Sequence, residues 1–102
     1  MIIVTGEARF GAGEIERLKD DFAANIAATR AEDGCLAYCY AVDIADPNLL
    51  HISERWRDEA AVDAHMTAPH MGPFMAALGA AKIEALSVKA YRASDWKTLL
   101  GS

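Results

Sequence analysis

Several features that mark particular classes of protein are scarce or missing in this chain of 102 residues. Basic residues are outnumbered, with ten Lys and Arg against fifteen Asp and Glu, which argues against binding to a nucleic acid. No apolar run approaches the ~20 residues that span a bilayer, and residues 1–10 lack the apolar core of a signal peptide. We therefore expect a cytoplasmic protein that binds neither nucleic acid nor membrane.

Residues that hold metals, disulfides or nucleotides are equally sparse. The two cysteines, Cys35 and Cys39, have a spacing that is a poor zinc or redox signature, so we expect reduced thiols. On a strand both would point to the same face as small buried side chains. The three histidines are not joined by a carboxylate at a familiar metal-ligand spacing, and no glycine-rich loop follows a predicted strand. The sequence therefore predicts neither a metal site nor a bound nucleotide.

Alanine, in contrast, is abundant. Apolar residues make up 53% of the chain, but twenty-one residues are Ala, which adds little buried area. The length suits one compact domain with little margin of stability. A thin core in a short chain favours dimerisation.

Hydrophobic periodicity predicts an alternation of strands and helices. Period-two patterns predict strands at 2–10, 35–43, 49–56 and 83–91. Helical spacing predicts helices at 14–31, at 58–66 with Asp58 as the N-cap, and at about 70–80. Residues 45–48 have the composition of a hairpin turn, and Asp33-Gly34 that of a left-handed helix stop.

The resulting order, β-α-β-β-α-β, is that of an α+β, ferredoxin-like split βαβ fold with a four-stranded antiparallel sheet. Helices would cover one face, and the other would carry residues such as Ile3, Cys35 and Cys39. Because both faces are partly apolar, we predict a homodimer in which two sheets pack face to face as a dimeric α+β barrel. The domain would span residues 1–92, and residues 93–102 would form a C-terminal tail.

Polar residues that could take part in catalysis gather on the predicted helix-covered face. Glu54 and Trp56 lie two apart on one strand, so they share that face. A buried carboxylate needs a partner, because an unpaired buried charge costs several kcal/mol. His65 lies near the end of the following helix, beside inward-facing apolar residues. The sequence thus predicts a pocket between sheet and helices, surrounded by Glu54, Trp56, His65, Tyr38 and His70.

Two stretches carry a resemblance to a known family. One is Glu32-Asp-Gly-Cys-Leu-Ala-Tyr38, and the other runs from Glu54 through His65 to His70 and Phe74 as E-x-W-x-(D/E)-x-A-x(4)-H-x(4)-H-x(3)-F. This pattern resembles the antibiotic biosynthesis monooxygenase-like family of dimeric α+β barrel proteins, which includes small quinol monooxygenases. The resemblance implies a homodimeric, cofactor-independent monooxygenase that oxidises a phenolic, quinol or polyketide-like ring with dioxygen.

Such a reaction needs a base, a site for an aromatic ring and exclusion of bulk water. His65 suits the base because histidine titrates nearest neutrality, and Glu54 would support it. Trp56, Tyr38 and Phe74, together with His70, would bind the substrate ring.

Each of these residues also has a structural interpretation. Trp56 can be a core aromatic, Glu54 can pair with an Arg, and His65 can interact with its helix dipole. His70, beside Pro69, can simply belong to an exposed loop or a helix start. Two further functions stay open: a non-catalytic ligand-binding or stress-associated dimer, and an isomerase or haem-degrading relative. The family's haem degraders carry an Asn near the first strand, and residues 1–10 hold none.

Overall fold

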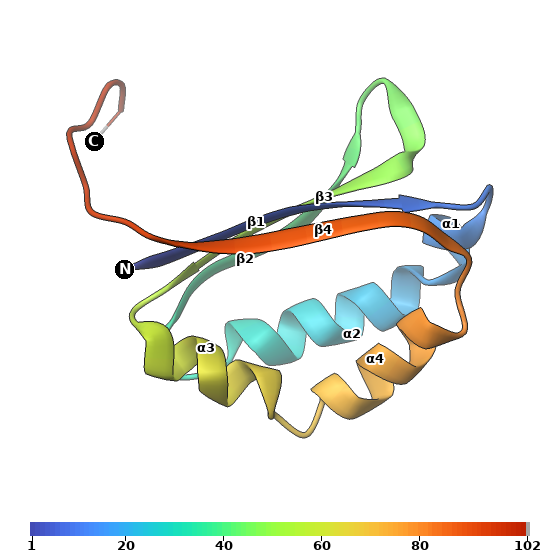
Figure 1. Ribbon diagram of the computed structural model, residues 1–102, viewed down its shortest axis with the longest axis horizontal. Coiled ribbons are helices and arrows are strands. Elements are labelled where there is room, and N and C mark those ends of the chain that lie inside the picture. The colour runs from blue at the N-terminus through green and yellow to red at the C-terminus, as the bar shows by residue number, and fades with distance from the viewer. Residues whose placement is uncertain (102) are drawn as a thin grey trace.

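The computed structural model describes residues 1–101, which form an antiparallel sheet with helices on one face (Figure 1). The elements in chain order are β1 (Ile2–Phe10), α1 (Glu14–Arg17), α2 (Lys19–Arg30), β2 (Cys35–Asp43), β3 (Asp46–Trp56), α3 (Glu59–Met66), α4 (Met71–Gly79) and β4 (Ile83–Arg92). The four strands lie in the order β2-β3-β1-β4, and each neighbouring pair is antiparallel. The predicted α+β, ferredoxin-like fold is confirmed.

Strand alternation places the core beneath the helices. In β1, Ile2, Val4, Ala8 and Phe10 are buried, whereas the residues between them are more exposed. The pairing of β1 with β3 sets Ile2 opposite Trp56. The buried side of β1 therefore continues into the buried residues of β3, beneath the helices.

Strand β4 forms an edge that the helices leave largely uncovered. Its register with β1 puts Leu86 opposite Ala8 and Val88 opposite Gly6, on the helix side of the sheet. Yet Leu86 is 59% exposed and Val88 47% exposed. The space between β4 and the two C-terminal helices is consequently open to solvent.

The helix predicted over residues 14–31 is interrupted at Leu18, which separates α1 from α2. Leu18 N–H still donates to Glu14 O, and Phe22 N–H donates to Leu18 O, both at 2.9 Å. The two helices therefore continue one another. Leu18 itself is 1% exposed, as the predicted apolar stripe requires.

The hairpin turn between β2 and β3 comes earlier than the composition indicates. The turn is Ile44 and Ala45, and β3 begins at Asp46. Asp43 and Asp46 each accept a backbone N–H from two residues further along, from Ala45 and Asn48. The register also shifts between Val42 and Asp43, so the extra residues of β3 are absorbed as an irregularity.

The prediction that Cys35 and Cys39 share the open face is wrong. The register of β2 against β3 shifts between Cys35 and Ala37, so a bulge reverses the alternation. Cys35 packs against the core that contains Trp56, and burial raises the pKa of its thiol. Cys39 is exposed.

Two capping predictions are confirmed. Asp58 is the N-cap of α3, and its side chain accepts the N–H of Ala61 at 2.9 Å. Gly34 has φ +83°, the left-handed conformation expected after α2. None of the helices in residues 1–101 has the length and apolar character that crossing a membrane requires.

The open face of the sheet is more polar than the sequence suggested. A shallow hollow on it is lined by Thr5, Glu7, His51, Lys89 and Tyr91, among others. Pairing of two copies through this face stays a prediction, as does the division of the chain at residue 92.

Candidate functional site

A cavity of about 370 Å³ lies between the sheet and helices α3 and α4. Most of its wall is apolar, and the main apolar side chains are Val4, Ile52, Val62, Met66, Met71, Phe74, Met75, Leu78, Leu86 and Val88. Its polar side chains come from Tyr38, Tyr40, Glu54 and His65. An apolar cavity with a few convergent polar groups is typical of a small-molecule site.

His65 is the buried histidine of this site, and only 3% of it is exposed. It belongs to the last turn of α3, whose inner face turns it toward the sheet. Its ring lies 4.8 Å from the ring of Trp56 and 5.6 Å from that of Tyr38, measured between centroids. The imidazole is therefore held between two aromatic side chains from different strands.

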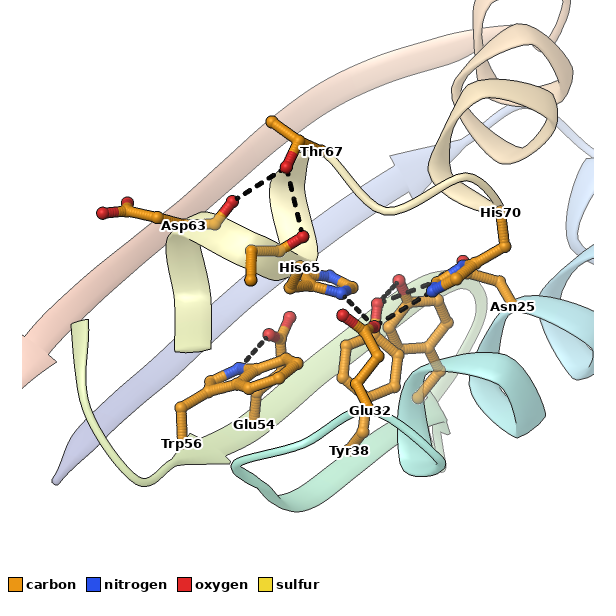
Figure 2. Close-up of polar contacts among 11 residues, drawn as sticks. Asn25, Glu32, Tyr38, Glu54, Trp56, Asp63, His65, Thr67 and His70 are labelled. Carbon is orange, nitrogen blue, oxygen red and sulfur yellow. Dashed lines mark hydrogen bonds and ion pairs between the residues drawn. The ribbon is translucent and has the colours of Figure 1, made fainter. Parts of the chain in front are cut away.

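The carboxylate bonded to His65 is that of Glu32 (Figure 2). His65 Nδ1 lies 2.7 Å from Glu32 Oε2, and His70 Nε2 lies 3.0 Å from the same oxygen. Because a carboxylate only accepts, the Nδ1–H of His65 donates, which leaves Nε2 with its lone pair. Within residues 1–101 no hydrogen bond reaches that Nε2, and His65 lines the cavity.

Gly34 allows Glu32 to come this close. It ends the connection from α2 to β2, and its carbonyl accepts the N–H of Arg57 at 2.8 Å. A Cβ at this position would lie only 2.6 Å from Cβ of Ala61 in α3. The connection that carries Glu32 thus packs directly against the helix that carries His65.

A hydrogen-bonded chain continues from His70 to two tyrosines. His70 Nδ1 lies 2.8 Å from Asn25 Oδ1, and Asn25 Nδ2 donates to the Tyr38 hydroxyl at 3.2 Å. The hydroxyls of Tyr38 and Tyr40 are 2.6 Å apart. Burial raises the pKa of both phenols, so both stay protonated and can donate.

Glu54 lies in the cavity wall but is bonded to Trp56. The indole N–H of Trp56 donates to Glu54 Oε1 at 2.8 Å. Burial raises the pKa of Glu54, the indole hydrogen bond opposes that rise, and the negative charge of Glu32 adds to it. The pairing of Glu54 with an Arg that the sequence allowed is replaced by this indole contact.

The structure divides the predicted site residues into two groups. Tyr38, Glu54, His65 and Phe74 all line the cavity. Trp56 is fully buried behind the wall, at 0% exposure, where it supports His65 and Glu54. His70 belongs to a separate small hollow on the outer side of the helices, which Phe74 also borders. Neither Trp56 nor His70 is placed to touch a ring inside the cavity.

Sequence reasoning did not assign roles to Glu32, Asn25 and Tyr40. Glu32 is the first residue of the first family-like stretch. Its position next to Asp33-Gly34 indicated the end of a helix and not a functional role. Asn25 is a polar residue between alanines and Ile26, and its spacing from Leu18 and Phe22 puts it on the buried face of the helix, where it is 3% exposed. Tyr40 is two residues after Tyr38, so the two share one strand face, and this spacing indicated that Tyr40 lies near the site.

The arrangement offers two kinds of chemistry. His65, oriented by Glu32, can accept a proton from a ligand in the cavity. Glu32, His65 and His70 also present three ligand atoms that all lie within 4.8 Å of one another, as a metal site would require. The spacing of these residues does not predict the cluster, because Glu32 is 33 residues from His65 and 38 from His70.

Comparison with known proteins gives a consistent family match. Residues 1–77 match the family model for antibiotic biosynthesis monooxygenases. A crystal structure from Deinococcus radiodurans, provisionally named an antibiotic biosynthesis monooxygenase, is similar with a TM-score of 0.90 and 29% identity. That match covers 99% of this chain and 100% of the other. Rv0793 from Mycobacterium tuberculosis is similar with a TM-score of 0.83 and 26% identity, over 95% and 98% of the chains.

A curated relative is an uncharacterised protein, sll1783, of a Synechocystis strain. It is 28% identical over 71 residues, which is 70% of this chain. The match covers 48% of the relative, so this chain spans about half the length of that protein.

Proposed function

Because the chain belongs to the antibiotic biosynthesis monooxygenase family, we propose that it is a monooxygenase for an electron-rich aromatic ring. The substrate class is a phenol, quinol or polyketide-like ring, and dioxygen is the oxidant. The observation that carries the proposal is the Glu32–His65 pair at the wall of an apolar cavity. We propose further that two copies pair through their open sheet faces and that the reaction needs no cofactor.

His65 is the base in this proposal. Its Nε2 takes the hydroxyl proton of the substrate, and Glu32 stabilises the imidazolium through the Nδ1–H contact of 2.7 Å. Glu32 thus has the supporting role that was predicted for Glu54 from the sequence. The base is thereby fixed in one tautomer before the substrate arrives.

Deprotonation makes the ring a one-electron donor to dioxygen. The phenolate gives an electron, and the phenoxyl radical and superoxide combine into a ring peroxide. The peroxide anion takes back the proton held by His65. The hydroperoxide then loses water, made from its outer oxygen, that proton and the hydrogen of the oxygenated carbon, and the other oxygen stays on the ring as the new carbonyl of the quinone. The chain's part is to bind the ring, remove the proton and exclude bulk water.

The tyrosines and apolar side chains serve binding. Phe74 and the methionines of α3 and α4 supply apolar contact to a ring. One of Tyr38 and Tyr40 donates to the other, and the second hydroxyl can donate a hydrogen bond to an oxygen of the ring. Trp56, which is fully buried, positions the imidazole from behind. His70 holds Glu32 from the outer side.

A non-catalytic ligand-binding dimer is the second candidate. It is favoured by the fact that Glu54 and His65 each have a partner within the chain. An open cavity in which Nε2 of His65 has no hydrogen-bond partner among residues 1–101 favours the oxygenase instead. The two candidates differ in turnover, not in ligand binding.

Oxygen uptake with a panel of substituted hydroquinones tests the proposal. We expect uptake with at least one substrate, and a fall of about 10²-fold or more in kcat for His65→Gln, since general bases contribute 10²–10⁴-fold. His51→Ala is the matched control, because His51 lies on the open face and outside the cavity. Equal rates for wild type and His65→Gln would defeat the assignment of the base.

A further inference from the structure

One carboxylate oxygen, Oε2 of Glu32, contacts two imidazoles at once. His65 Nδ1 lies 2.7 Å from it and His70 Nε2 lies 3.0 Å from it. Among the ion pairs of residues 1–101, Glu32 is paired with these two histidines and with no Lys or Arg. The neutralising charge for this carboxylate therefore has to come from within the cluster.

A neutral ring of His70 has only one N–H, and the ring faces two hydrogen-bond acceptors. Asn25 uses its amide nitrogen to donate to Tyr38, so Oδ1 faces His70 Nδ1 and can only accept. That fixes a hydrogen on Nδ1 of His70 and leaves a lone pair on Nε2. Two lone pairs would then face each other across 3.0 Å, at Nε2 and at Glu32 Oε2. A proton on Nε2, which would make the ring an imidazolium, or a metal ion between the two atoms would remove this repulsion.

We propose that Glu32, His65 and His70 bind a divalent transition-metal ion of the Zn²⁺ type. Two imidazole nitrogens and one carboxylate oxygen are a donor set that Zn²⁺ takes, with a fourth position left to water or another small ligand. Donor atoms around a tetrahedral ion with bonds near 2.1 Å lie about 3.4 Å apart. The carboxylate oxygen lies 2.7 and 3.0 Å from the two nitrogens, so it has to withdraw by about 0.4–0.7 Å to admit an ion. All three donors lie within 4.8 Å of one another.

The surroundings fit a metal centre in two ways. Asn25, 3% exposed, accepts the Nδ1–H of His70, which is the outer contact that orients metal-binding histidines. Glu54 lines the same cavity as His65, so the site holds a second acidic side chain whose charge an ion would offset.

The ion and the proposed base exclude one another. A metal on His65 Nδ1 leaves the ring hydrogen on Nε2, the nitrogen that would otherwise take the substrate proton. The ion is thus an occupant of the base's site and no part of the reaction. Its binding is measured directly, so the inference can fail or hold whether or not the chain oxidises any ring.

Co²⁺ and Zn²⁺ alone are the probes. After treatment with a chelator, we titrate the full chain with Co²⁺ and record visible absorption, and titrate it with Zn²⁺ in a calorimeter. We expect one ion per chain, a Co²⁺ spectrum of four-coordinate character, and loss of that spectrum when Zn²⁺ is added. Absence of saturable binding, or a spectrum of purely six-coordinate, aqueous type, would overturn the proposal.

Variants locate the ion. Glu32→Gln and His70→Gln should each weaken Zn²⁺ binding by about tenfold or more, since changes even in supporting contacts cost 10–100-fold. His51→Ala, which removes the histidine of the surface, should bind as the wild type does. Far-UV circular dichroism verifies that each variant is folded; His70 is partly exposed, so its replacement retains the fold most readily. Binding that is lost in His51→Ala, or unchanged in folded His70→Gln, would place the ion elsewhere and refute this site.

Discussion

Two clusters of histidine and carboxylate lie on opposite faces of the same sheet. On the open face, His51 contacts Asp43 at 2.8 Å and Glu7 at 3.9 Å, and 41% of its side chain is exposed. On the helix side, the side chain of His65 is only 4% exposed. In the first cluster one histidine lies between two carboxylates, and in the second one carboxylate lies between two histidines.

The comparison shows that burial and the identity of the shared group decide what such a cluster can do. In the single chain, water and salt screen the pairs of His51, so these pairs add little stability. The contacts of Glu32 lie in a place where an unmade hydrogen bond costs about 1–3 kcal/mol. Only the second cluster therefore holds a buried histidine beside the apolar cavity.

The largest expected difference is in stability. His65→Ala removes a ring packed between Trp56 and Tyr38 and leaves Glu32 without a partner, so we expect a loss of about 2–4 kcal/mol in the free energy of unfolding. His51→Ala should leave the urea midpoint unchanged within error. Urea unfolding of both variants measures the contrast. Similar losses in the two would show that the buried cluster contributes no more than the surface one.

A smaller effect should follow when the elements that carry the buried cluster are pushed apart. Gly34→Ala places a Cβ at φ +83° and 2.6 Å from Cβ of Ala61, so we expect a loss of about 2–3 kcal/mol, with disturbance of the Glu32–His65 contact. Gly13→Ala is the matched control, because its φ is +80° and nothing lies within 4 Å of its added Cβ. That variant should lose only the conformational part, about 1–2 kcal/mol. Equal losses in thermal unfolding would mean that the α3 contact contributes nothing.

The contribution of Glu54, in the cavity, to the free energy of unfolding should change with pH in the opposite direction from that of Asp43 on the surface. Burial raises the folded-state pKa of Glu54 above its unfolded value, so the folded chain holds this proton more tightly, and stability falls as pH rises between the two values. Glu54→Gln keeps the acceptor for Trp56 and removes that fall. We expect a higher urea midpoint than wild type at pH 7, with the difference vanishing below about pH 4.3. A variant less stable than wild type at pH 7 would show that the charged form is the favoured one.

The smallest effect concerns Asp43. The hydrogen bond from His51, with that from Ala45 N–H, lowers the pKa of Asp43, so its contribution is present above about pH 3.9 and is lost as pH falls through the folded-state value. In His51→Ala the pKa of Asp43 should rise toward its ordinary value. Carboxyl ¹³C titration by NMR follows this change. An unchanged titration would assign the whole effect to the backbone contact.

The sequence supports a prediction of the fold because its strands alternate cleanly and its helices carry apolar stripes. Tyr38, Glu54, His65 and Phe74 could be placed around one cavity for the same reason. The face on which Cys35 lies could not be predicted, because a bulge reverses the strand alternation at one residue and no residue pattern in the sequence indicates it. Glu32 and His70 could not be joined to His65, because their contact depends on how the α2–β2 connection packs against α3. Local periodicity does not encode such long-range packing.

The uncovered edge along β4 has a consequence for which molecules can enter. The cavity is closed at the end where His65 and the tyrosines lie, and open where Leu86 and Val88 are exposed. We therefore expect a ligand to enter from the β4 side, and a substituent on its ring to extend over this exposed edge.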